Sequence, residues 1–192
     1  MITVEPITLN LKSVNLSDEQ FYQLCHNNDD WRIEQTAAGE LIIMPPIAAI
    51  SGNRESDLNG FVWLWNRQTK LGKVFSYSTI FTLPKGGKCS PDVAWIANER
   101  WDALPREEQE KFATICPDFV IELRSHTDSL TQLQAKMQEY LDSGLRLGWL
   151  IDPISQQVAI YRQNQEVEIV PLPTTLSGEK VLPGFTLELP LF

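Results

Sequence analysis

The stretch PDFVIELRSHTDSLTQLQAKMQEYLDSGLRLGWLIDP, from Pro117 to Pro153, predicts the strand, helix and strand around which the fold is organised. Residues 118–124 have the apolar content of a buried strand. Apolar residues then recur every three or four positions over 129–143, which predicts an amphipathic helix ending at Gly144. A second apolar strand follows at 146–152, so the helix predicts a right-handed parallel crossover between two strands of one sheet.

Two charged side chains interrupt the first of these strands. Glu122 and Arg124 lie two positions apart, so both leave the strand on the same face. A buried charge is costly unless it is paired or binds a metal, which leaves two interpretations: an ion pair with neighbouring strands, or a functional site. Lys136 lies at the edge of the apolar stripe of the following helix, where it either turns toward the sheet or remains a solvated lysine.

Outside this unit, helix and strand patterns alternate along the chain. They predict a helix at 17–28 with a capping box, a hairpin of 31–34 and 40–44, a helix at 52–69, an antiparallel pair of 74–83 and 90–96, and strands at 158–162 and 167–172. The predicted fold is α/β: a central mixed sheet with strands 74–83, 90–96, 118–124 and 146–152, flanked by helices 52–69 and 129–143, with additional N- and C-terminal β-hairpins.

The composition is that of a globular protein. With 192 residues, 43% hydrophobic and 21% charged, we expect a single domain over 1–192. No apolar run approaches the roughly eighteen residues of a membrane span, and the N-terminus lacks a signal-peptide pattern, so we expect a cytoplasmic protein without membrane contact. The three cysteines have neither disulfide nor metal-site spacing. A net charge of −9 argues against a protein that coats nucleic acid, but not against a nuclease with acidic metal ligands.

Two further carboxylates come from other elements. Glu55 lies three residues before Leu58 on the inward face of helix 52–69, where it either satisfies the helix dipole or faces a site. Asp92 follows Pro91 at the start of strand 90–96, where it either caps a turn or reaches the same site.

The charged residues that converge on this sheet are Glu55, Asp92, Glu122, Arg124 and Lys136. Carboxylates from separate elements beside a cation predict a site that holds a divalent metal through oxygen and activates water next to a phosphodiester. Asp118 and Glu122 cannot bind the same metal ion, because four residues of strand span roughly 13 Å.

These segments resemble a known family. Ser90-Pro91-Asp92-Val93, Pro117 to Leu123 and Lys136 to Pro153 are similar to the Uma family of bacterial restriction endonuclease-like proteins, within the PD-(D/E)XK nuclease superfamily. The resemblance covers most of the chain and implies a restriction endonuclease-like fold. It also implies that Asp92 and Glu122 are metal ligands, and that Glu55 is the helix acid that many members add.

The sequence departs from the superfamily pattern at Arg124, where a lysine is expected two residues after the acid. An arginine stays protonated and cannot act as a base, although it can stabilise a developing phosphorane. Family members without the strand lysine often retain a lysine at the place of Lys136, which is therefore the candidate replacement. His126 stands in a loop and is interpreted as a surface residue.

Two functional hypotheses follow. In the first, the protein is a Mg²⁺- or Mn²⁺-dependent endonuclease that hydrolyses DNA, with Asp92, Glu122 and Glu55 as acids and Lys136 polarising the attacking water. In the second, it is a catalytically inactive nuclease-fold module with a binding or regulatory role, which the acidic composition and Arg124 would suit. Because double-strand cutters usually act in pairs, a homodimer is expected.

Overall fold

A six-stranded mixed sheet forms the centre of the computed structural model, which describes residues 5–11, 13–14 and 16–189. In spatial order its strands are β11 (Glu168–Pro171), β10 (Gln157–Arg162), β9 (Leu147–Asp152), β8 (Phe119–Leu123), β7 (Val93–Ala97) and β4 (Gly72–Ser76). β8 and β9 are parallel, and the other neighbouring pairs are antiparallel. The predicted mixed sheet is therefore confirmed.

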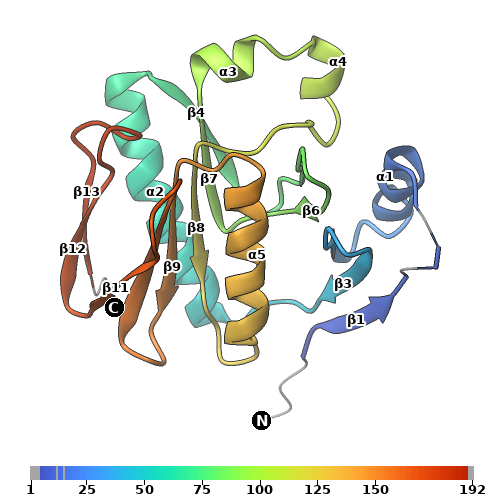
Figure 1. The fold of residues 1–192 in the computed structure, drawn as a ribbon, viewed down its shortest axis with the longest axis horizontal. Coiled ribbons are helices and arrows are strands. Elements are labelled where there is room, and N and C mark those ends of the chain that lie inside the picture. Colours follow the sequence, from blue (N-terminus) through green and yellow to red (C-terminus); the bar gives the residue numbers. More distant parts are fainter. Residues whose placement is uncertain (1–4, 12, 15, 190–192) are drawn as a thin grey trace.

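Two helices cover opposite faces of this sheet (Figure 1). α5 (Leu130–Asp142) connects β8 to β9 and buries Met137 and Tyr140 against one face. α2 (Ala49–Thr69) buries Leu58, Val62 and Trp65 against the other. Strand residues alternate between the two cores as the pleat requires, so Phe119 and Ile121 pack toward α2 while Val120 packs toward α5.

The ends of α5 follow from local chemistry. The Ser129 side chain accepts a hydrogen bond from the backbone N–H of Gln132, which caps the first turn. Gly144 adopts a φ of 107° directly after the helix, in a region that side chains rarely enter. The helix predicted at 129–143 is thus confirmed within one residue at each end.

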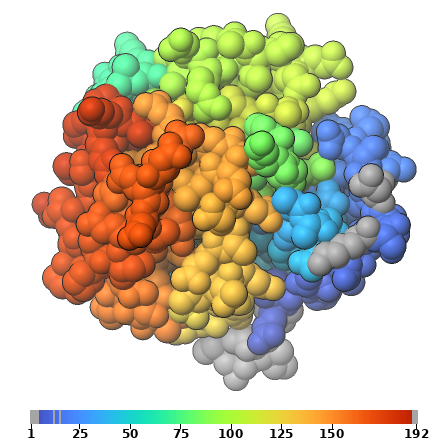
Figure 2. Space-filling model, viewed as in Figure 1, coloured from blue at the N-terminus to red at the C-terminus, as the bar shows by residue number. Residues whose placement is uncertain are grey.

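A second sheet is built mainly from the N-terminal part of the chain. Its strands, in spatial order, are β1 (Ile7–Asn10), β3 (Glu40–Met44), β2 (Arg32–Gln35), β6 (Lys88–Cys89) and β5 (Phe81–Thr82). The predicted hairpin at 31–34 and 40–44 is present as β2 and β3. α1 (Asp18–His26) precedes it with the predicted capping box between Ser17 and Gln20. Figure 2 shows that α5 lies on the surface between this N-terminal part and the C-terminal strands.

One predicted strand is divided between the two sheets. The segment 74–83 was expected to be continuous, but β4 ends at Ser76 and belongs to the central sheet, while β5 belongs to the second sheet. A turn separates them: the Thr79 N–H donates to Ser76 O at 3.0 Å, and the Ser76 and Ser78 hydroxyls lie 3.1 Å apart. The antiparallel pairing with 90–96 is retained by β4 and β7.

The remaining segments complete the edges of the fold. The strands predicted at 158–162 and 167–172 extend the central sheet as β10 and β11, and a separate hairpin of β12 (Thr174–Ser177) and β13 (Thr186–Leu189) follows. Two short helices, α3 (Asn98–Asp102) and α4 (Arg106–Gln109), lie between β7 and β8. Cys89 and Cys116 are buried free thiols, and Cys25 is partly buried. Within the described ranges, the helices are too short or too polar to cross a membrane.

Candidate active site

Antiparallel pairing of β7 and β8 places Asp92 next to Glu122. Val93 lies opposite Ile121 in the register, so Asp92, one residue earlier, meets the end of β8. There its Oδ2 accepts a hydrogen bond from the Leu123 N–H at 2.7 Å. Both carboxylates are buried, with 7% of Asp92 and 2% of Glu122 exposed. Asp92 is therefore fixed to the neighbouring strand by its side chain, beyond the role of a local turn cap.

Lys136 reaches this pair from α5. Its Nζ lies 2.9 Å from Glu122 Oε1 and 3.1 Å from Glu34 Oε1, and it donates to the Ser90 carbonyl at 3.3 Å. Only 12% of the lysine side chain is exposed. The predicted proximity of Lys136 to Glu122 is confirmed, and the interpretation of a solvated lysine is wrong.

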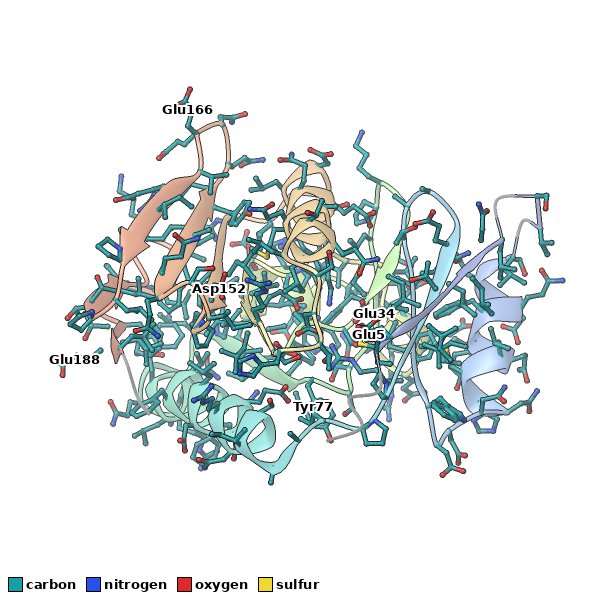
Figure 3. All side chains as sticks on the ribbon, turned by 90° about the horizontal axis from the view of Figure 1, so that it is seen from below. Glu5, Glu34, Tyr77, Asp152, Glu166 and Glu188 are labelled. Atoms are coloured by element: carbon teal, nitrogen blue, oxygen red, sulfur yellow. The ribbon has the colours of Figure 1, made fainter. Side chains whose placement is uncertain are left out.

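Glu34 on β2 is a further member of this cluster, and it is not among the residues that the sequence predicts for the site. Its Oε1 accepts hydrogen bonds from the backbone N–H and the hydroxyl of Ser90, both at 2.9 Å, and lies 3.3 Å from Arg32 Nη2. Arg32 also donates from Nε to the Ser90 hydroxyl at 2.8 Å, and its Nη1 lies 3.7 Å from Asp92 Oδ1. In Figure 3, Glu34 enters from the side of the N-terminal sheet.

A sequence signal for these two residues existed. Arg32 and Glu34 are charges two positions apart in a short strand with a buried Ile33 between them, the same pattern that singled out Glu122 and Arg124. Alternation places both charges on one face, which in this fold is the face turned toward Asp92 and Lys136.

Tyr140 is a second such residue, because its place in the apolar stripe of α5 predicts only a core position. Its hydroxyl donates to Glu122 Oε1 at 3.0 Å, while its ring is fully buried beside Met137. One carboxylate oxygen of Glu122 therefore receives both Lys136 and Tyr140.

Arg124 turns away from these acids. Its Nη1 lies 2.9 Å from Asp152 Oδ2 on the adjacent β9, and its Nε donates to the Asp128 carbonyl at 3.4 Å. The interpretation of an ion pair with a neighbouring strand is thus correct for Arg124, whereas Glu122 pairs with the helix residue Lys136.

Glu55 is buried on α2 at the same end of the sheet. α2 begins at Ala49, so Glu55 lies beyond the first turn and the helix-dipole interpretation is wrong. Burial, and then repulsion from Asp92, raises the pKa of Glu55 to about 7, although Arg32 acts in the opposite direction. Its Oε2 is buried and has no hydrogen bond among the residues that the structure describes.

The pKa values of the two strand acids, Asp92 and Glu122, are raised as well. Burial raises the pKa of Glu122 to about 8, with Lys136 opposing the rise and Asp92 and Glu34 adding to it. Burial likewise raises the pKa of Asp92, against the influence of Arg32 and Lys136. Burial would lower the pKa of Lys136, but Glu122 and Glu34 raise it above its usual range, so the ammonium stays charged.

The acids have the oxygen donors that a divalent cation prefers, but their side chains do not converge on one point. Over residues 5–11, 13–14 and 16–189, no three His, Cys, Asp or Glu side chains form a group tight enough to coordinate a metal. Among the predicted ligands, the charge of Asp92 raises the pKa values of both Glu122 and Glu55. Oxygen donors and an unpartnered Glu55 oxygen nevertheless suit a divalent cation.

Two other candidates lie outside the cluster. Asp118 is fully buried at the opposite end of β8, where it accepts from the Ala97 N–H at 2.9 Å and pairs with Arg100 at 3.1 Å and Arg146 at 3.3 Å. It is a structural acid, as its separation from Glu122 predicts. His126 is exposed, as predicted.

Comparison with known proteins gives one family and one fold. Residues 18–190 match the model of the Uma2 family, described as "Putative restriction endonuclease". A crystal structure of a "putative nuclease belonging to DUF820" from Anabaena variabilis ATCC 29413 is similar at a TM-score of 0.69 and 24% identity, over 81% of this chain and 86% of that one. The fold is therefore shared with that structure. No curated protein sequence matches the chain.

Proposed function

Because the chain belongs to the Uma2 family, described as "Putative restriction endonuclease", we propose that it is a nuclease that uses Mg²⁺ or Mn²⁺ to hydrolyse DNA phosphodiester bonds. The observation that carries the proposal is the contact of 2.9 Å between the Lys136 ammonium and Glu122 Oε1, next to Asp92. This contact brings a permanent cation to the carboxylates that the superfamily uses for metal binding, although the strand position holds Arg124.

In this proposal Asp92 and Glu122 hold the metal, with Glu55 as an auxiliary acid from α2. Bound there, a divalent ion would supply Lewis acidity toward the phosphoryl oxygen and toward the attacking water. The remaining work belongs to the chain. Lys136 stays protonated, so it acts by charge: it stabilises negative charge on the phosphorane and orients the attacking water. Arg124 retains donors beyond its Asp152 contact and can bind a flanking phosphate.

A direct test combines calorimetry with cleavage. Titration of Mn²⁺ into the wild type is expected to give binding heat that Asp92→Ala removes. Supercoiled plasmid incubated with Mn²⁺ is expected to be nicked or linearised, and EDTA is expected to stop the reaction. RNA of matched length, assayed in parallel, tests the choice of substrate. Absence of both heat and cleavage would favour the non-catalytic module.

Cleavage of both strands by a chain with one such site requires two copies, so the proposal includes a homodimer. Light scattering of the protein with and without a DNA duplex measures this directly. A monomer that only nicks one strand would limit the activity to single-strand cleavage.

A further inference from the structure

The ammonium of Lys136 is held by three oxygen atoms. It donates hydrogen bonds to Glu34 Oε1 at 3.1 Å and to the Ser90 carbonyl at 3.3 Å, and it forms an ion pair with Glu122 Oε1 at 2.9 Å. Only Glu122 belongs to the strand acids of the central sheet. Glu34 lies on β2, and Ser90 lies in the link between β6 and β7, so the N-terminal sheet supplies a large part of the surroundings of this lysine.

Glu34 is itself held in one place. Its Oε1 receives the Ser90 backbone N–H and hydroxyl at 2.9 Å each, with Arg32 Nη2 at 3.3 Å, and the residue is 2% exposed. Because Ser90 is bound to Glu34 and also accepts from Lys136, Glu34 fixes the lysine twice: directly, and through the Ser90 carbonyl. The carboxylate also draws the ammonium away from an exclusive pairing with Glu122.

We propose that Glu34 is the positioning residue of Lys136, and that the N-terminal sheet is thereby a working part of the active site. The inference rests on the proposed nuclease function for its catalytic consequence, but not for its structural one. Glu34 is too buried to touch DNA, so it acts on the reaction through the lysine. Without its charge, Lys136 would settle on Glu122, the carboxylate that the metal also needs.

The alternative is a purely structural role, in which Glu34 only holds the second sheet in place. Glu139 offers a matched control, because it lies one turn beyond Lys136 on α5 and also reaches this sheet: the Ala37 N–H donates to both its carboxylate oxygens at 3.2 Å. Glu139→Gln therefore perturbs the docking of the sheet on α5 without removing a hydrogen-bond partner of Lys136.

The first readout is independent of activity. Acetylation of Lys136 by acetic anhydride, followed by mass spectrometry of the native protein, reports how well the amine is held. Loss of a charged hydrogen-bond partner is expected to raise its labelling rate at least about tenfold in Glu34→Gln, whereas Glu139→Gln should match the wild type. Equal labelling of Lys136 in wild type and Glu34→Gln would overturn the proposal.

The second readout is a double-mutant cycle on Mn²⁺-dependent DNA cleavage. Glu34→Gln is expected to lower kcat about tenfold to a hundredfold with KM for DNA unchanged, and to cost nothing more in a Lys136→Ala background. Losses that multiply in the double mutant would show a role unrelated to the lysine and would also overturn the proposal.

The two proposals fail separately. If the wild type does not cleave DNA, the proposed function is wrong, and the labelling experiment alone decides the role of Glu34. If Glu34→Gln does not fold, Ser90→Ala takes its place, because it keeps the backbone of Ser90 and removes only its hydroxyl, which donates to Glu34 Oε1 and accepts from Arg32 Nε. Labelling of Lys136 should then rise relative to wild type, and an unchanged rate would count against the positioning role.

Discussion

Arg124 and Asp152 form an ion pair across the two parallel strands β8 and β9, with Arg124 Nη1 2.9 Å from Asp152 Oδ2. The aspartate is almost fully buried, and its other oxygen accepts the backbone N–H groups of Ile154 and Ser155. The pair therefore joins the end of β8 to the turn after β9. It also explains why the charge that follows Glu122 on the strand is not directed at Glu122.

This ion pair should make stability depend on pH. Burial raises the pKa of Asp152, but hydrogen bonds from Ser155 and Arg124 outweigh it and leave the pKa below the usual value. A carboxyl with a lowered folded-state pKa stabilises the protein above its unfolded pKa of about 3.9, and that contribution is lost as the pH falls through the folded-state pKa. We expect Asp152→Asn to cost about 1–3 kcal/mol at pH 7 and progressively less as the pH falls below about 3.9. Urea unfolding over this range of pH measures the change.

The lysine on α5 should be essential for cleavage, and the strand arginine should not be. Lys136→Ala is expected to reduce Mn²⁺-dependent DNA cleavage by about a hundredfold or more, because a preorganised charge at the phosphorane is removed. Arg124→Lys should leave the rate unchanged or raise it. Single-turnover kinetics on a labelled duplex separates the two variants, and full activity in Lys136→Ala would take the lysine out of the mechanism.

Neutralising Asp92 should weaken Mn²⁺ binding more than neutralising Glu55. Asp92→Asn is expected to eliminate the binding heat of Mn²⁺, because a principal oxygen ligand loses its charge. Glu55→Gln should weaken binding by about tenfold to a hundredfold, as expected for an auxiliary acid. Isothermal titration of both variants at one pH provides the comparison, with Asp142→Asn on the exposed side of α5 as the control. Equal affinity in all three would exclude these acids as ligands.

The packing of α5 on β9 depends on Gly148. A Cβ at this position would lie 2.5 Å from Met137 Cε and 2.8 Å from Leu145 Cδ2. We expect Gly148→Ala to destabilise the protein by about 1–3 kcal/mol through overpacking. Gly60→Ala is the control, since its Cβ would meet no atom within 4 Å and alanine favours a helix. Thermal unfolding, followed by circular dichroism, should show a lower Tm for Gly148→Ala and not for Gly60→Ala.

Local patterns in the sequence predicted what local physics determines. The apolar stripe of α5 placed Lys136 at the edge of the buried face, and strand alternation put Glu122 and Arg124 on one face. The partner of Arg124 was not predictable, because a strand neighbour such as Asp152 depends on tertiary pairing. Glu34 lies 102 residues from Lys136, and its strand β2 pairs with β6 through Gln35 and Lys88, far from it in the sequence. No short-range pattern encodes such a contact.

The division of 74–83 has the same origin. Its residues favour a strand throughout, and only the turn at Ser76–Thr79 lets one half enter each sheet. Propensity alone does not distinguish a continuous strand from two strands that serve different sheets. The metal ligands Asp92, Glu122 and Glu55 remain a prediction that titration must decide.

The separation of 102 residues between Glu34 and Lys136 has a consequence for the protein as it is being made. At about 5–20 residues per second, the ribosome needs roughly 5–20 s between adding one partner and adding the other. During that interval Glu34 has no lysine beside it, and the strand that carries Glu122 is itself completed only shortly before α5. The contacts of Lys136 with Glu34 and Glu122 therefore form only after α5 has left the ribosome and docked, so the proposed nuclease site is completed late in synthesis.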